Sequence, residues 1–247
     1  KIENINNLNI EANNVVLEVK FIMIEKKIFE NLKNIFFKNH ISLIDIFCTT
    51  YIKSLGFVNK NNISEKTAFI DIGFSKSSLA IFKNQKLLYL NNIHIGGDHI
   101  TKDISKVLKL DYRKAEAWKK KFSKNKQFVG DSDSQNNLKQ IINSRLEEII
   151  ELLFFNCPLI NNKNFETGLK LIFTGNGSKV LNENLLSFGP EFSFIKDMSI
   201  FDDERRETCD SALRFSLKNE VTESQKSPLN LDNKGFFEKL FGYFTSK

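Results

Sequence analysis

The chain alternates between short, dense runs of apolar residues and longer stretches in which apolar residues recur every three or four positions. Residues 15–24 form such a dense run, with the character of a strand. The apolar residues after it follow at helical spacing: Phe29, Leu32, Ile35 and Phe36. A β-α unit is therefore predicted here. After another apolar stretch over residues 41–51, the polar segment 60–66 is typical of a joint between domains.

Three short strands are predicted after this joint. Residues 67–72 have the composition of a buried strand and end in Asp-Ile-Gly, and residues 78–82 form a second strand. Residues 83–86 make a polar turn into a third strand over residues 87–93. The pattern predicts a β-meander with a tight polar loop after its first strand.

Helices are predicted where this sheet pattern stops. Gly96 and Gly97 interrupt the strand periodicity, and Asp98 is placed to cap a helix that ends near Leu108. A second helix begins near Asp111. Two consecutive helices are therefore expected to follow the meander.

The second half of the chain is predicted to contain a long helix, a buried strand and further helices. A long amphipathic helix is predicted over residues 137–155, with these apolar positions on one side: Leu138, Ile141, Ile142, Leu146, Ile149, Ile150 and Leu153. Residues 169–173 form a buried strand, and the glycine-rich loop 174–178 leads into a helix. A last core helix is predicted over residues 203–217, and residues 218–234 lack periodicity and are predicted to be a linker.

Composition limits the class of protein. The 247 residues are 41% hydrophobic, enough for a sizeable core in one large or two modest domains. The net charge of +6 comes from lysines scattered through the predicted helices and loops, without a stripe of basic and stacking aromatic side chains. Nucleic acid is therefore not expected as a partner.

Cysteine usage and hydropathy indicate the compartment. Cys48, Cys157 and Cys209 lie far apart without a CxxC spacing, which favours neither a disulfide framework nor a zinc site. No apolar run approaches the roughly twenty residues of a spanning helix, and no signal peptide opens the chain. A cytoplasmic protein is expected, and because Lys1 begins the chain in mid-pattern, we expect further residues upstream.

The loop after the first meander strand has the residues of a phosphate site. A carboxylate at a strand end holds a hydrated cation, and a glycine beside it lets backbone N–H groups approach a phosphate. The chain offers Asp71, Gly73, Ser75, Ser77 and Ser78 for these tasks. By itself the Asp-x-Gly pattern equally fits an ordinary turn. The loop 174–177 likewise fits either a flat base or sugar, or a plain connection between strand and helix.

Five segments occur in an order and separation that resemble the FtsA family, whose members have the actin-like ATPase fold. In chain order they are IDIGFSKSSLAIF, IGGDHITKDI, AEAWK, RLEEIIELL and LIFTGNGS. The resemblance implies an α/β fold of the actin-like, ribonuclease H-like class, with a mixed sheet and flanking helices. It covers nearly the whole chain, and GGDHITKDI together with AEAWK is its most specific part.

The resemblance also implies ATP and Mg²⁺ as ligands. At the matching positions, Asp71 would hold a water molecule of the magnesium ion, while Gly73 and Ser75 would face the phosphates. Ser77 would match a hydroxyl of the same loop. These roles follow from the family and not from the spacing of the residues.

The adenosine side is implied in the same way. Glu116 and Lys119 would touch the ribose or the base edge, and the loop of Gly175, Asn176 and Gly177 would pack on the adenosine. Taken without the family, Glu116 and Lys119 share one helix face and equally form a surface salt bridge.

The chain departs from the family pattern at two places. Phe74, Ser75 and Lys76 stand where the family usually has Gly-Gly-Thr, and Asn176 stands where it usually has Gly. The bulk of Phe74 opposes close approach to a phosphate, although Lys76 adds a compensating charge. Reduced ATP affinity or turnover is expected, and no general base stands out. Since the first phosphate loop of this fold lies upstream, residues 1–247 alone are expected to bind ATP weakly.

The last residues form an amphipathic pattern. At about 100° per residue, the apolar side chains of residues 235–247 fall in one sector: Phe236, Phe237, Leu240, Phe241, Tyr243 and Phe244. Such a helix suits lying in the lipid headgroup layer, and docking on the protein's own core is the alternative. FtsA proteins end in a similar linker and membrane helix.

The resemblance implies a cell division adaptor that tethers FtsZ filaments to the cytoplasmic face of the inner membrane at the septum. The FtsZ tail, further divisome proteins and other copies of the chain are the expected partners. Arg145 and Glu148 match positions of the lobe that binds the FtsZ tail, and solvated helix charges explain them equally well. An actin-fold enzyme, such as a sugar kinase or exopolyphosphatase, and a PilM-like pilus assembly ATPase are the alternatives.

Four regions are expected from these arguments. Residues 1–57 would end a small α+β subdomain specific to the family and lead to the second lobe. Residues 58–217 would form the second, nucleotide-binding lobe. The linker 218–234 and the membrane helix 235–247 would follow.

Overall fold

The chain divides into two compact units, Lys1–Ile46 and Phe47–Lys247. A computed structural model describes the following residues: 20–123, 132–155, 157–160, 168–181, 193–201 and 205–224. The division lies before the second helix of the chain, and this helix therefore belongs to the second unit. The sequence placed the boundary after Phe57, within that helix.

The first unit contributes helix α1, Lys26–Lys38, as the sequence predicted. Residues 20–25 have no regular secondary structure, so the expected strand over residues 15–24 is wrong for the part described. A strand requires hydrogen bonds to a neighbouring strand, and the sheet pairs none of its strands with this segment. α1 has no buried residue, and Phe21 and Met23 before it are exposed.

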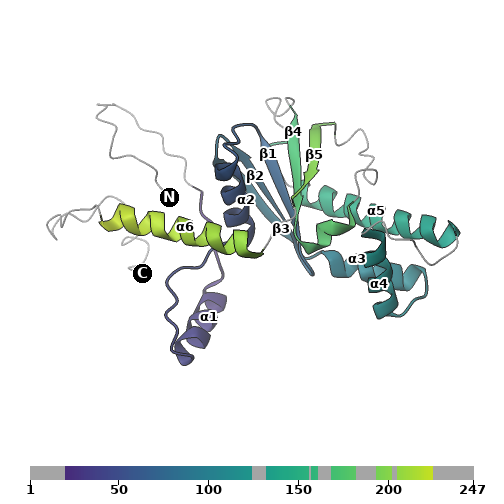
Figure 1. The fold of residues 1–247 in the computed structure, drawn as a ribbon, viewed down its shortest axis with the longest axis horizontal. Helices are drawn as coiled ribbons and strands as arrows, with labels where there is room; N and C mark the ends of the chain where they lie inside the picture. The colour runs from purple at the N-terminus through teal and green to yellow at the C-terminus, as the bar shows by residue number, and fades with distance from the viewer. Residues whose placement is uncertain are drawn as a thin grey trace. The chain divides into compact units, whose positions relative to one another are not determined.

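A mixed five-stranded sheet is the centre of the second unit (Figure 1). Its strands, listed in chain order, are β1 Thr67–Ile72, β2 Ser77–Lys83, β3 Lys86–Ile93, β4 Leu169–Thr174 and β5 Ile195–Ile200. The order across the sheet is β3-β2-β1-β4-β5, with antiparallel pairs within the meander β1 to β3 and parallel pairs from β1 to β4 and from β4 to β5. The predicted meander is confirmed, and β5 was not predicted.

Helices cover both faces of the sheet, which explains the near-continuous apolar runs of β1 and β4. One face carries α3 Gly97–Val107, α4 Tyr112–Ser123 and α5 Ser132–Phe154, and its core joins alternate β1 residues to α5. The other face carries α2 Thr49–Lys60 and α6 Arg205–Ser224. Its smaller core contains Val58, Phe69, Ala80, Phe82 and Ile172.

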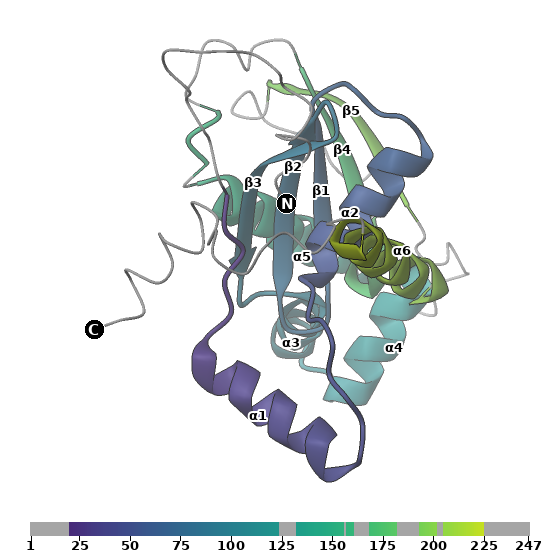
Figure 2. The same cartoon turned by 90° about the vertical axis from the view of Figure 1, so that its left-hand side faces the viewer.

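Helix α6 differs from its prediction in two respects. It packs across α2, as Figures 1 and 2 both show, with the Phe215 ring against Phe47 and Tyr51. None of its side chains at residues 208–217 is fully buried, so it is a covering helix and not a core helix. It also continues to Ser224, and the first part of the expected linker is therefore helical. In the described chain, no helix combines the length and hydropathy that crossing a bilayer requires.

Gly56 sets how closely α6 crosses α2. A Cβ atom at Gly56 would lie 2.1 Å from Ser211 Oγ and 2.8 Å from Ser211 Cβ. We expect Gly56→Ala to lower the free energy of unfolding by about 1–2 kcal/mol, because the overlap exceeds the gain in helix propensity. The double variant Gly56→Ala with Ser211→Gly removes the overlap and should return to near wild-type stability in urea denaturation. Equal stability of all three proteins would contradict this packing.

Candidate functional site

Three chain segments meet at the carboxyl ends of β1 and β4. These strands are parallel neighbours, and Asp71 lies opposite Thr174 in their register. The loop after β1 and the loop after β4 therefore start side by side, and the start of α3 joins them. In open α/β sheets ligands bind at the carboxyl ends of parallel strands, so this junction is the candidate site.

The loop after β1 is fastened to the start of α3 by backbone hydrogen bonds. Gly73 N–H donates to the Lys76 carbonyl at 2.9 Å, which closes the turn. Gly97 N–H donates to the Gly73 carbonyl at 2.9 Å, and Asp98 N–H to the Phe74 carbonyl at 2.8 Å. The first N–H groups of a helix have no partner within the helix, and here the loop supplies two.

The expected phosphate-loop residues differ in their exposure. Ser75, Lys76 and Phe74 are exposed, and Phe74 keeps 69% of its surface accessible. Ser77 is buried, and its hydroxyl donates to the Ile95 carbonyl at 2.7 Å. The tip of the loop is therefore its most exposed part, while Asp71, Gly73 and Ser78 are half-buried.

The glycine loop after β4 packs directly on the end of β1. Gly175 has a φ of 87°, and a Cβ atom there would lie 2.2 Å from Asp71 Oδ1. A Cβ atom at Gly177 would lie 2.8 Å from the Ile72 carbonyl oxygen. Asn176 between them is exposed and opens a 3₁₀-helix, Asn176–Val180, where the sequence predicted a helix. The two loops predicted to share a site are brought together, with glycine required by their contact.

The Thr174 side chain marks the same junction. It is 1% exposed, and its hydroxyl has no hydrogen-bond partner in the described part of the chain. Buried hydroxyl groups normally have a hydrogen-bond partner, so the Thr174 hydroxyl is an unsatisfied polar group at the candidate site.

Asp71 is paired with a lysine that the sequence analysis did not single out. Lys53 Nζ of α2 lies 3.2 Å from Asp71 Oδ2, and the two side chains are 10% and 15% exposed. No sequence motif indicates Lys53, because its ion pair with Asp71 depends on the packing of α2 against the sheet. Lys53 also lines a groove of about 730 Å³ between α2 and α6.

The pairing bears on whether these residues fit a magnesium ion. Mg²⁺ takes oxygen ligands and uses one or two carboxylates together with phosphates and water. One Asp71 oxygen carries the Lys53 ammonium, and the other lies against Gly175. The expected role of Asp71 as holder of a magnesium water stays a prediction, and the Lys53 pair competes with a cation for one of its two oxygens.

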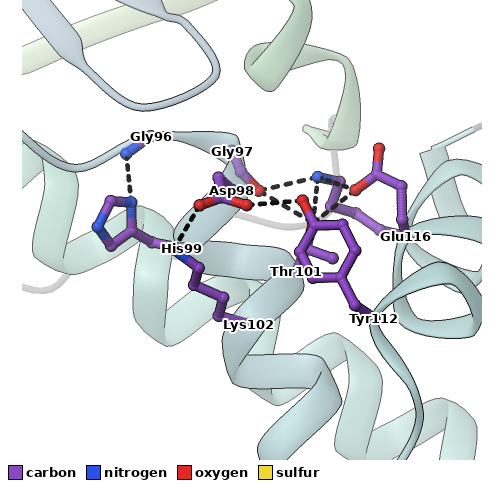
Figure 3. A network of polar contacts seen from close by, with 9 residues as sticks. Gly96, Gly97, Asp98, His99, Thr101, Lys102, Tyr112 and Glu116 are labelled. Carbon is purple, nitrogen blue, oxygen red and sulfur yellow. Dashed lines mark hydrogen bonds and ion pairs between the residues drawn. The ribbon is translucent and has the colours of Figure 1, made fainter.

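Lys119 and Glu116 form a buried network and not a surface salt bridge (Figure 3). Lys119 Nζ donates to the Gly97 carbonyl at 2.8 Å and to Thr101 Oγ1 at 2.6 Å, and lies 2.7 Å from Glu116 Oε2. The Thr101 hydroxyl donates to the same Glu116 oxygen at 2.5 Å. Although burial opposes it, hydrogen bonds from Lys119 and Thr101 hold the pKa of Glu116 below its usual value.

Asp98 forms a second network at the start of α3 (Figure 3). The helix is capped at Gly96, so the prediction of Asp98 as the cap is wrong. Its carboxylate lies 2.7 Å from Lys102 Nζ and accepts a hydrogen bond from the Tyr112 hydroxyl at 2.6 Å. These contacts, Lys102 first, lower the pKa of Asp98. The carboxylate is thus engaged by one residue of α3 and one of α4, and it makes no capping hydrogen bond to the backbone N–H groups of α3.

The residues expected to bind partners divide into two groups. Arg145 Nε lies 2.6 Å from Asp103 Oδ2 of α3, and its guanidinium also contacts Glu148. These contacts, with the Asp103 hydrogen bond as the largest effect, raise the pKa of Arg145. The predicted exposed charges are thus partly used to join α5 to α3. The proposed membrane residues 236–244 lie outside the described residues.

Comparison with known proteins identifies relatives of this chain. The family model described as Cell division protein FtsA matches residues 68–182. The cell division protein FtsA of Bacillus subtilis is 31% identical over 157 residues, which are 56% of this chain and 36% of that protein. The one from Streptococcus pneumoniae is 44% identical over 50 residues, 20% of this chain and 11% of that protein. The matched part thus spans about a third of the length of the Bacillus relative.

Solved structures share the fold. MreB5 of Spiroplasma citri bound to AMPPNP superposes with a TM-score of 0.59 at 16% identity, over 81% of this chain and 68% of that chain. The same protein bound to ADP gives 0.58 at 18% identity, over 83% and 69%. The fold is actin-like, a mixed five-stranded sheet with flanking helices, and the predicted fold class is confirmed.

Removal of the Lys119 charge tests the buried network. We expect Lys119→Met to lower the free energy of unfolding by about 2–3 kcal/mol, because it removes the buried ammonium that Glu116, Thr101 and the Gly97 carbonyl share. Lys120→Met is the matched control. Lys120 is 70% exposed and lies 3.3 Å from the other Glu116 oxygen, so its loss should cost less than about 0.5 kcal/mol in urea denaturation. Equal small losses would show that the network adds nothing to stability.

Tyr112 offers a titration that reports on the α3–α4 contact. Its hydrogen bond to Asp98 is the largest cause that raises its pKa to about 12. The raised pKa favours the neutral phenol in the folded state, so this contribution is complete below about pH 10 and is lost as pH rises toward 12. In a phenolate absorbance titration against Tyr112→Phe, Asp98→Asn should move the midpoint down toward about 10. An unchanged midpoint would rule out the contact.

Proposed function

We propose, on the premise that this chain belongs to the FtsA family of cell division proteins, that it is an ATP-binding, actin-like adaptor. In this role it tethers FtsZ filaments to the cytoplasmic face of the inner membrane at the division septum and helps to recruit other divisome proteins. Family membership is the observation that carries the proposal. It favours an adaptor over a sugar kinase or a PilM-like ATPase.

The nucleotide would bind at the junction of the two glycine loops. The observation in favour is their direct contact at the carboxyl ends of β1 and β4, and MreB5, which has the same fold, is solved with AMPPNP and with ADP. Ser75 and Asn176 are exposed at the loop tips, so they are the residues we propose for direct contact with phosphate and adenosine. Gly73, Gly175 and Gly177 would bring the backbone close.

The buried residues of the site have supporting roles in this proposal. Lys119 is 9% exposed and joins α4 to the Gly97 carbonyl, so it would fix the start of α3 beneath the phosphate loop. Glu116 keeps 25% of its side chain exposed and is the better candidate for a ribose contact. Ser77 would hold the loop through its hydrogen bond to the Ile95 carbonyl.

Membrane attachment would come from residues 235–247 after a linker. Because α6 continues to Ser224, the proposed linker shortens to residues 225–234. One short amphipathic helix binds lipid weakly, and association into filaments multiplies the anchors, so that effective concentration converts weak contacts into firm attachment. Self-association would therefore control the affinity for the membrane.

The FtsZ tail would bind the surface of α5 near Arg145 and Glu148. Arg145 is paired with Asp103, so it would orient the surface, whereas the Glu148 side chain, 45% exposed, is accessible to a basic group of the tail. The region before Phe47 would contribute the family-specific subdomain.

A co-sedimentation experiment with lipid vesicles and FtsZ tests this function. We expect Phe241→Glu to reduce sedimentation of the protein, and of FtsZ with it, at least about tenfold, because it places a charge in the apolar sector and removes an aromatic anchor. Thr245→Glu is the matched control, because it adds the same charge on the polar side. Undiminished sedimentation of Phe241→Glu, or equal loss in both variants, would contradict the proposed anchor.

A further inference from the structure

We infer that Lys53 takes the place of a divalent cation at Asp71, so that this chain binds a nucleotide phosphate without a metal ion held by that carboxylate. The inference rests on the proposed nucleotide site and specifies how its charge is balanced. It concerns whether the site requires Mg²⁺. The loop residues do not answer this question, because Lys53 comes from α2.

The position of Lys53 is the first observation. Its ammonium lies 3.2 Å from Asp71 Oδ2, at the strand end where a hydrated cation would meet the carboxylate. Both side chains are largely buried. Removing either partner from a buried pair leaves an uncompensated charge, so the pair resists opening to admit a metal ion.

The second Asp71 oxygen is crowded by the glycine loop after β4. It lies where a Cβ atom on Gly175 would come within 2.2 Å, so the glycine loop crowds it on one side. A metal-bound water on this oxygen would have to displace the loop that forms the site. The carboxylate thus has an ammonium on one oxygen and the glycine loop beside the other.

The helix that carries Lys53 is firmly held. α2 turns Thr50, Ser54 and Val58 toward the sheet, and all three are buried. Ile52, beside Lys53, is 2% exposed. Because Ile52 and Ser54 on either side of Lys53 are buried, packing of α2 fixes the position from which the Lys53 side chain extends to Asp71.

The carboxylates around the loops follow one rule. Asp71 pairs with Lys53, Asp98 with Lys102, and Glu116 with Lys119 and Lys120. Each negative charge described at the junction is neutralised by a lysine of the same chain. Mg²⁺ is recruited by carboxylates that remain free to meet it. The arrangement instead suits a phosphate that meets a neutral surface, with the exposed Lys76 at the loop tip as an added positive charge.

The test is the Mg²⁺ dependence of ATP binding, measured by calorimetry in Mg²⁺ and in EDTA. It uses the full chain together with any residues that precede Lys1 in the natural protein. We expect the wild-type dissociation constant to change by less than about threefold when Mg²⁺ is removed. Lys53→Met should lose at least about tenfold in EDTA and recover in Mg²⁺, because the unpaired Asp71 then repels phosphate unless a cation screens it.

Two variants control for charge and folding. Lys60→Met removes a second lysine of α2 without touching the Asp71 pair and should behave as wild type. The double variant Lys53→Met with Asp71→Asn removes both charges, avoids a buried unpaired carboxylate, and should again be indifferent to Mg²⁺. A second readout is Mn²⁺ binding in the absence of nucleotide, followed by electron paramagnetic resonance, which Lys53→Met should gain over wild type.

The outcomes separate this inference from the proposed function. Equal dependence on Mg²⁺ in wild type and Lys53→Met, or Mn²⁺ binding by wild type that matches the variant, overturns the role of Lys53 and leaves the nucleotide site standing. Failure of the wild type to bind ATP in either buffer overturns the nucleotide site itself, and this inference with it.

Discussion

The close contact between the glycine loop after β4 and the end of β1 is the constraint on which the candidate site depends. It requires glycine at positions 175 and 177, because a side chain at either would overlap Asp71 or the Ile72 carbonyl. The loop after β1 is in turn fastened to the start of α3 through the Gly73 and Phe74 carbonyls. Three segments far apart in the sequence thus become one rigid junction, with their backbones closer than any residue with a Cβ atom allows.

Lysine pairing is the second organising feature of this junction. Lys53, Lys102 and Lys119 come from three different helices, and each ends on a carboxylate beside the loops. Such pairs contribute little at an exposed surface. Where both partners are largely enclosed, as for Lys119 and Lys53, they fix which helix face meets which loop. In the proposed nucleotide site, the same pairs would present neutralised carboxylates and not free ones to a phosphate.

The two faces of the sheet have different uses. α3, α4 and α5 build the larger core together with the sheet, and they lie within residues 68–182, which the FtsA family model matches. α2 and α6 form the thinner layer on the other face. α2 nevertheless reaches the site, because Lys53 extends from it to Asp71. A helix outside the matched residues 68–182 therefore affects the chemistry of the loops inside them.

The sequence by itself determined the elements whose signals are local. Strands β1 to β4 and helices α3 to α5 follow from apolar periodicity and from glycine breakers, and the family resemblance follows from five ordered segments. Tertiary structure alone decided the partners of charged groups. Three contacts depend on elements that meet only in the folded chain. They are the pairing of Lys53 with Asp71, the burial of Lys119 against Gly97, and the hydrogen bond that Asp98 accepts from Tyr112. The missing strand pairing of residues 20–24 and the covering position of α6 have the same cause. Periodicity states which face of an element is apolar, but not which neighbour that face will meet.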